Sequence, residues 1–101
     1  MEDQRKIKIN YKGKEVEVSI RKITWKEQNE ATRAALINGK MDFVVLQELK
    51  LLKSIVDAPF PKTMEELWGL DASEGDKLFK VFSELNGISE EVQKNSNSPL
   101  T

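Results

Sequence analysis

Hydrophobic and polar residues alternate in two runs near the beginning of the chain, which is typical of β-strands. The apolar members of these runs share one face, and they are Ile7, Ile9, Tyr11, Val16, Val18 and Ile20. Lys12-Gly13-Lys14 separates the runs and indicates a tight turn. We therefore predict a β-hairpin over residues 5–23. Because an isolated hairpin is only marginally stable, it must pack on a helical layer or pair with strands of a neighbouring subunit.

The densest apolar stretch, residues 41–56, has helical spacing. Its polar positions, such as Gln47, Lys50 and Ser54, fall three or four residues apart and form one narrow stripe. Apolar side chains cover most of the remaining surface, so we predict a central helix around which the other elements pack. This helix should end before Pro59, because proline disfavours helical geometry in the preceding residue. Either the other elements wrap it closely or a second chain covers it.

Two capping boxes mark the beginnings of other helices. Thr24-Trp25-Lys26-Glu27 and Thr63-Met64-Glu65-Glu66 each place a glutamate three residues after a threonine. In a capping box both of these side chains bind backbone amides at the helix start. We predict that the first helix continues to Ile37, because Asn38-Gly39 supplies a left-handed stop. The second helix is short, because Gly69 weakens its continuation.

A last helix is predicted after Asp71 or Ser73, either of which can cap it. Its apolar residues recur at intervals of three and four, and they are Leu78, Val81, Phe82 and Leu85. Asn86-Gly87 ends this helix, and Ile88 is expected to fold back against its last turn.

Together these elements predict an α+β fold, mainly α, in which an N-terminal β-hairpin precedes about four helices packed around the central apolar helix. We expect one small domain over residues 1–94, with the hairpin at 5–23 and the helical part at 24–88. Residues 89–94 are a weak helix at best. The polar residues 95–101 are expected to form a disordered tail.

Two aromatic residues have alternative interpretations. Trp25 is expected in the core or at the joint between hairpin and helix, and the alternative is a binding anchor at the helix start. Phe60 lies between Pro59 and Pro61. It is expected to fill the core, and the alternative is a surface anchor for a partner.

Composition narrows the possible functions. The chain has 101 residues, 39% of them hydrophobic and 33% charged, and its 16 basic and 17 acidic residues give a net charge of −1. We therefore expect no general attraction to nucleic acid or to an anionic membrane. No apolar run approaches the roughly 20 residues of a membrane span, and the first residues lack the apolar core of a signal peptide. An intracellular, cytoplasmic location is expected.

Catalytic residues of the common types are missing from the sequence. Cysteine and histidine are absent, which removes thiolate nucleophiles, most zinc sites and the usual general base. The nucleotide-binding, nucleophile-elbow and zinc-protease motifs are also absent. The acidic segment 71–76 does not fit a calcium loop, because Asp76 and Phe82 stand where an EF-hand needs glycine and glutamate. We expect no enzymatic activity, no cofactor and no metal.

Four short segments, read together, resemble a known family. They are Ser54-Ile-Val-Asp-Ala-Pro-Phe60, Thr63-Met-Glu-Glu-Leu67, Gly75-Asp-Lys-Leu-Phe79 and Glu84-Leu-Asn86. With the Thr24-Trp25-Lys26-Glu27 helix start, they are similar to the small tail assembly chaperones of long-tailed bacteriophages and prophages. The similarity extends over roughly residues 20–94.

This resemblance implies a mostly helical protein of the host cytoplasm. Such a chaperone binds hydrophobic segments of the tape-measure protein and keeps it soluble until tail-tube subunits polymerise around it. The tail-tube protein is a possible further partner, and a homo-oligomer is expected. We expect the partner-binding residues among the exposed members of Phe43, Val44, Leu51 and Phe60.

Two other classes of function remain open. One is a small structural or connector protein of the virion, such as a head-tail joining or tail-tube-associated protein, which would form ordered rings and stay in the particle. The other is a small regulatory protein that binds a host enzyme through an acidic helical face.

Overall fold

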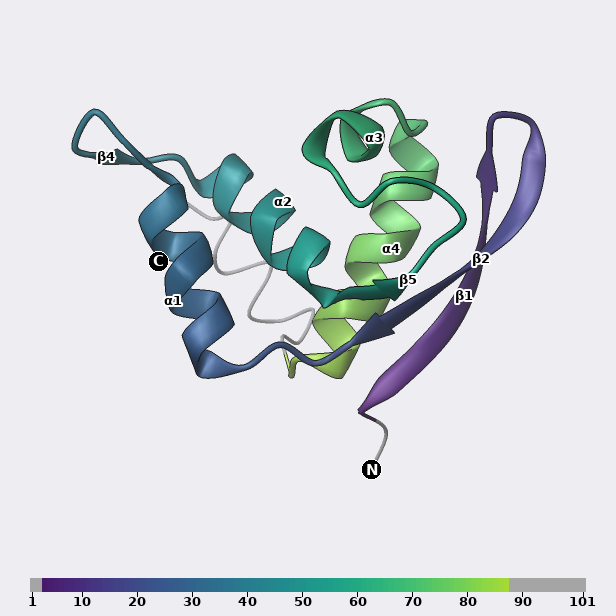
Figure 1. Cartoon of the computed structure of the whole chain (residues 1–101), viewed down its shortest axis with the longest axis horizontal. Coiled ribbons are helices and arrows are strands. Elements are labelled where there is room, and N and C mark those ends of the chain that lie inside the picture. Colours follow the sequence, from purple (N-terminus) through teal and green to yellow (C-terminus); the bar gives the residue numbers. More distant parts are fainter. Residues whose placement is uncertain (1–2, 88–101) are drawn as a thin grey trace, which may run out of the picture.

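The computed structural model describes residues 3–87 and is an α+β domain with a three-stranded sheet, a small two-stranded sheet and four helices in this range (Figure 1). The strands are β1 (Gln4–Tyr11), β2 (Lys14–Arg21), β3 (Leu36–Ile37), β4 (Lys40–Met41) and β5 (Ile55–Asp57). The helices are α1 (Trp25–Ala34), α2 (Phe43–Ser54), α3 (Met64–Trp68) and α4 (Ala72–Leu85). The α+β class with about four helices is confirmed. The predictions for Ile88, residues 89–94 and the tail 95–101 lie outside the described residues.

The predicted hairpin is formed by β1 and β2, which pair antiparallel with Ile9 opposite Val16. Its turn consists of Lys12 and Gly13, whose φ angles of 50° and 81° are both positive. Such a two-residue turn matches the twist of the strands that it joins. The predicted apolar face is buried at Ile9, Val18 and Ile20 and half-buried at its other three members, and the remaining polar face carries Lys6, Lys8, Glu15 and Glu17.

A third strand completes the sheet and shortens the predicted helix over residues 41–56. α2 ends at Ser54, and β5 follows at once and pairs antiparallel with β2, with Ile20 opposite Ile55. Ile55 and Val56 are β-branched and favour the extended conformation. The hairpin therefore receives both a strand and a helical layer from its own chain, so it does not depend on a neighbouring subunit.

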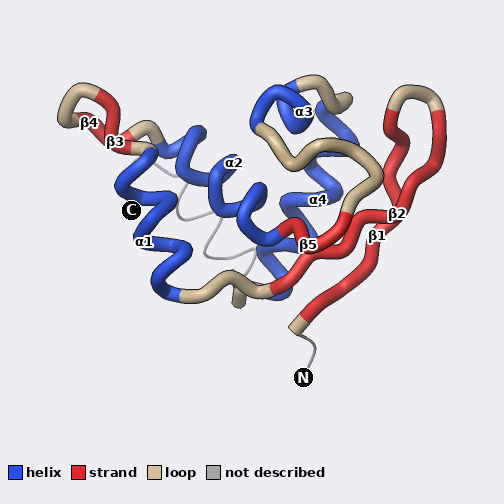
Figure 2. Tube along the Cα trace, in the orientation of Figure 1, coloured by secondary structure: helices blue, strands red, loops and turns tan. Residues whose placement is uncertain are grey.

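The helix that packs on the sheet is α4. Its predicted stripe is buried against β1 and β2, in one cluster with Ile9, Val18 and Ile20. In α2 the buried residues are Leu51 and Ser54, while Phe43 and Val44 are exposed. The packing therefore does not confirm that the other elements surround α2. Instead, α2 lies between α1 and α4 in the helical part of the domain (Figure 2).

The first helix is shorter than predicted. α1 ends at Ala34, and the next residues form the two-stranded β3–β4 arm with Asn38 and Gly39 as its turn, at φ angles of 53° and 77°. Asn-Gly is a preferred two-residue hairpin turn as well as a helix stop. The N–H of Asp42 donates to the carbonyl oxygen of Ala35 at 2.9 Å and closes the arm.

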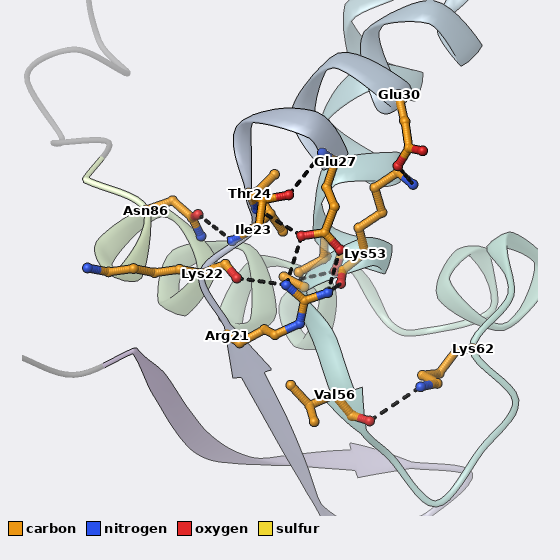
Figure 3. Close-up of polar contacts among 12 residues, drawn as sticks. Arg21, Lys22, Ile23, Thr24, Glu27, Glu30, Lys53, Val56, Lys62 and Asn86 are labelled. Atoms are coloured by element: carbon orange, nitrogen blue, oxygen red, sulfur yellow. Dashed lines mark hydrogen bonds and ion pairs between the residues drawn. The ribbon is translucent and has the colours of Figure 1, made fainter.

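A polar joint connects β2, α1 and α2 (Figure 3). The Arg21 guanidinium donates to both carboxylate oxygens of Glu27, at 2.9 and 2.6 Å, and to the carbonyl oxygens of Lys22 and Lys53. The predicted capping box of Thr24 and Glu27 is present. This joint fixes the direction of α1 as it leaves the sheet.

The two aromatic predictions have different outcomes. Phe60 is 7% exposed and stacks on Tyr11 with 4.7 Å between ring centroids, so its predicted core position is confirmed. Trp25 is 78% exposed, and its predicted place in the core or joint is wrong. Since Thr24 caps α1, Trp25 occupies the first helical position, and the joint beside it is made by Arg21 and Glu27 instead.

Candidate binding groove between three helices

A groove of about 420 Å³ lies where α2, α3 and α4 meet. In the view of Figure 1, α2 and α4 diverge toward their N-terminal ends, and α3 lies near the beginning of α4. We call this hollow the α2–α4 groove. Its lining residues are Val44, Gln47, Glu48 and Leu51 from α2, Leu67, Trp68 and Leu70 from α3 and the turn after it, and Asp71, Ala72, Gly75, Asp76 and Phe79 from the beginning of α4.

The α2 wall follows from helical spacing. Its four lining residues lie at positions i, i+3, i+4 and i+7, so they form one face. The helix begins sharply, because a carboxylate oxygen of Asp42 accepts hydrogen bonds from the N–H groups of Val44 and Val45, both at 3.1 Å. Val44 is 66% exposed, whereas Leu51 is buried.

The α4 wall is open at its middle. A Cβ atom placed on Gly75 would meet no atom within 4 Å, apart from its immediate surroundings in the helix. Apolar side chains lie on either side of this gap, from Leu70 to Phe79. A side chain of a partner can therefore approach the backbone of α4 here without displacing anything.

Trp68 joins two walls of the groove. Its indole N–H donates to Oε2 of Glu48 at 2.8 Å, which links α3 to α2, while its ring is 60% exposed. A tryptophan whose polar edge is satisfied and whose ring is accessible is well suited to contact a partner.

The charged residues of the groove are all acidic. Glu48, Asp71 and Asp76 line it, and no lysine or arginine in the described part of the chain does. Asp71 occupies the N-cap position of α4, yet its side chain makes no capping hydrogen bond. Asp71 therefore occupies the predicted N-cap position. The capping hydrogen bond predicted for its side chain is not formed.

The structure separates the four predicted partner-binding residues. Val44 and Leu51 line the groove, and Leu51 lies at its buried base. Phe43 is 71% exposed and lies one turn before Gln47, so it extends the same side of α2. Phe60 is buried against Tyr11 and is not part of the groove. Of the four, Phe43 and Val44 are therefore the members available to a partner.

Sequence reasoning missed the α3 and α4 walls. Trp68 lies in the short helix predicted after Thr63, and nothing in the surrounding sequence indicates its contact with Glu48, 20 residues away. Phe79 directly follows Leu78 of the buried stripe of α4, so its side chain lies beside that stripe, where it packs partly on the core and also lines the groove.

The other conspicuous polar groups have structural partners. The hydrogen bonds from Arg21 lower the pKa of Glu27 to about 2. Glu74 is buried beside β1, where its carboxylate accepts the Asn10 N–H at 2.6 Å, and this bond is the main reason that its pKa is lowered. These groups hold elements together and do not line the α2–α4 groove.

Neither a metal centre nor a membrane-spanning helix is found in the described part of the chain. Among residues 3–87, no group of three or more acidic side chains is arranged to hold a metal ion. No helix in that range has both the length and the apolar character to cross a bilayer.

Comparisons with protein-family models, curated proteins and solved structures find no match to this chain. The shape, exposure and charge of the α2–α4 groove therefore provide the basis for a functional argument.

Proposed function

We propose that the protein is a tail assembly chaperone that holds a hydrophobic helical segment of the tape-measure protein in the α2–α4 groove until the tail tube polymerises. The observation that carries this proposal is the groove itself, an apolar hollow bordered by exposed Val44 and Trp68. The choice of partner comes from the resemblance of the sequence to tail assembly chaperones.

The exposure of these side chains supports binding. Phe43, Val44 and Trp68 are each at least 60% exposed, and they lie on two neighbouring elements, at the beginning of α2 and the end of α3. Contiguous exposed apolar surface of this kind is typical of interaction sites. Covering it stabilises a complex by roughly 1–2 kcal/mol for each large side chain.

The dimensions of the groove suit a helix. Its lining residues extend over positions 44–51 of α2 and 72–79 of α4. At a rise of 1.5 Å per residue, each wall is about 10 Å long, or two helical turns. A partner helix would place apolar residues spaced i, i+3 or i+4 and i+7 between these walls.

Co-expression with fragments of a tape-measure protein tests the proposal. The protein should form a soluble, stoichiometric complex with a fragment that is insoluble alone, as judged by size-exclusion chromatography with light scattering. Trp68→Ala should weaken the complex at least tenfold, because it removes an accessible aromatic anchor. Trp25→Ala is the matched control, since Trp25 is also exposed but lies outside the groove.

Two results would overturn the chaperone proposal. One is that every fragment stays insoluble in the presence of the protein. The other is that Trp68→Ala and Trp25→Ala affect complex formation equally, which would place the contact outside the groove.

A virion structural protein is the second candidate. The β3–β4 arm supports it, because Leu36 and Ile37 are about half exposed and the arm projects from the helices, where a second copy can reach it (Figure 1). This candidate requires that the protein remains in purified particles and forms a closed ring alone. A chaperone is absent from finished particles.

A further inference from the structure

We infer that the α2–α4 groove selects apolar helical segments that are flanked by lysine or arginine. This inference rests on the proposed function, because it specifies the chemistry of the segment that the groove holds. It follows from the negative charges around the groove and from the carboxylate oxygens there that accept no hydrogen bond.

The acidic groups lie on both walls. Glu48 is on α2, and Asp71 and Asp76 are at the beginning of α4. One oxygen of Glu48 accepts the Trp68 N–H at 2.8 Å. Within residues 3–87, its other oxygen and the carboxylates of Asp71 and Asp76 take part in no hydrogen bond or ion pair. A carboxylate has room for several hydrogen bonds, so most of this capacity is available to a ligand.

Among the described residues, no lysine or arginine forms an ion pair with these three carboxylates. Lys53 of α2 pairs with Glu30 of α1, and Lys77 of α4 pairs with Glu74. Lys80 is four residues after Asp76, a spacing that permits an ion pair, yet the structure shows no pair between them. The groove therefore presents three negative charges around an apolar floor.

The arrangement favours one class of ligand. A segment with apolar residues at its centre can place them against Leu51 and Phe79. Lysine or arginine residues on either side of that centre can then lie beside the carboxylates. Binding of an acidic segment is disfavoured, because its carboxylates would lie beside those of the groove. Nucleic acid and anionic membranes are disfavoured for the same reason.

The test uses two synthetic 18-residue helical peptides with the same leucine-rich apolar face, one with lysine flanks and one with glutamate flanks. The protein carries Trp25→Phe, which leaves Trp68 as the single tryptophan. Because Trp68 borders the groove, its fluorescence reports binding there. Each peptide is titrated at 50 mM and at 500 mM NaCl.

We expect the lysine-flanked peptide to bind about tenfold more tightly at 50 mM salt, since three partly solvated ion pairs contribute modestly to affinity. At 500 mM salt the preference should nearly vanish, because screening is far stronger. The triple variant E48Q/D71N/D76N should lose the preference. D3N/E15Q/E17Q changes the net charge equally at positions that do not line the groove, and it should keep the preference.

Every other outcome contradicts the inference in a distinguishable way. If both peptides bind equally, the groove binds apolar helices without charge selection, and only the inference fails. If the preference survives in E48Q/D71N/D76N, or does not depend on salt, these carboxylates are not its source. If neither peptide binds, the proposed function fails as well. The salt dependence of the protein with its acidic residues intact provides a result even if the triple variant does not fold.

Discussion

The gap over Gly75 allows the groove to be filled without damage to the fold. A Cβ at this position meets no atom within 4 Å, and the backbone of Gly75 has no positive φ angle that would exclude other residues. We predict that Gly75→Leu blocks the α2–α4 groove and at the same time stabilises the protein. A variant that gains stability and loses binding cannot be explained by unfolding.

The expected sizes of both effects follow from the helix and from the ligand. Leucine is more favourable than glycine in a helix by about 0.8 kcal/mol, which raises the melting temperature by roughly 3–6 °C in a domain of this size. The new side chain occupies the place of one apolar anchor of the ligand. Losing such an anchor costs about 1.5–3 kcal/mol, which weakens binding roughly 10- to 100-fold.

Two measurements on the same samples check this prediction. Thermal denaturation followed by circular dichroism gives the change in stability, and titration with the lysine-flanked peptide gives the change in affinity. Gly75→Ala is the matched control, because it has the same favourable effect on the helix but adds only one carbon atom. Its melting temperature should rise while its affinity stays within about twofold of the original.

Two results would refute the reasoning. If Gly75→Leu becomes more stable and binds the peptide as before, the ligand does not occupy this groove. If Gly75→Leu and Gly75→Ala both lower the melting temperature, then the space over Gly75 is not open, and the described shape of the groove is wrong.

Three further predictions concern stability. Ser83→Ala should stabilise the protein by up to about 1 kcal/mol in urea denaturation, because the buried Ser83 hydroxyl has no hydrogen-bond partner in the described structure. Asn86→Ala should destabilise it by about 1–2 kcal/mol, because the Asn86 side chain accepts the Ile23 N–H and donates to the Phe82 carbonyl oxygen. Glu27 has its pKa lowered from 4.5 to about 2, so its contribution to stability is complete above pH 4.5 and is lost as the pH falls toward 2. Thermal melts over this range should show a smaller loss of stability in Glu27→Gln, in which the amide can still complete the capping box.

The elements predicted correctly are those determined by residues close together in the sequence. The β1–β2 hairpin depends on strict alternation and a two-residue turn, and the start of α1 depends on Thr24 and Glu27 three residues apart. The buried stripe of α4 likewise follows from its own spacing. Each of these signals is complete within a few residues, so no knowledge of the remaining fold was needed.

The errors fall where a local signal supports two structures and a contact made by other residues decides between them. Asn38-Gly39 can stop a helix or turn a hairpin, and the Asp42–Ala35 hydrogen bond selects the hairpin. Ile55 can extend a helix or begin a strand, and pairing with Ile20 selects the strand. The second capping box shows the same effect, because the Glu66 carboxylate accepts the Tyr11 hydroxyl at 2.7 Å instead of returning to Thr63.

The groove could be predicted only in part, because it is formed by helices that are separated in the sequence. The apolar character of α2 was visible in the sequence, and Val44 and Leu51 were identified from it. The opposite wall begins at Leu67, 16 positions after Leu51, and its opening depends on the absence of any side chain above Gly75. A sequence pattern records the side chains that are present and does not show which space they leave empty.

The exposed beginning of α2 links the fold to the proposed function. The core is complete without Phe43 and Val44, since α4 covers the sheet and Leu51 supplies the buried contact from α2. Phe43→Ser and Val44→Ser should therefore leave the free energy of unfolding within about 0.5 kcal/mol of the original, as substitutions on an exposed surface usually do. The same changes should weaken binding in the peptide titration. Apolar residues that folding does not require, placed beside an open groove, are best explained by a partner that covers them.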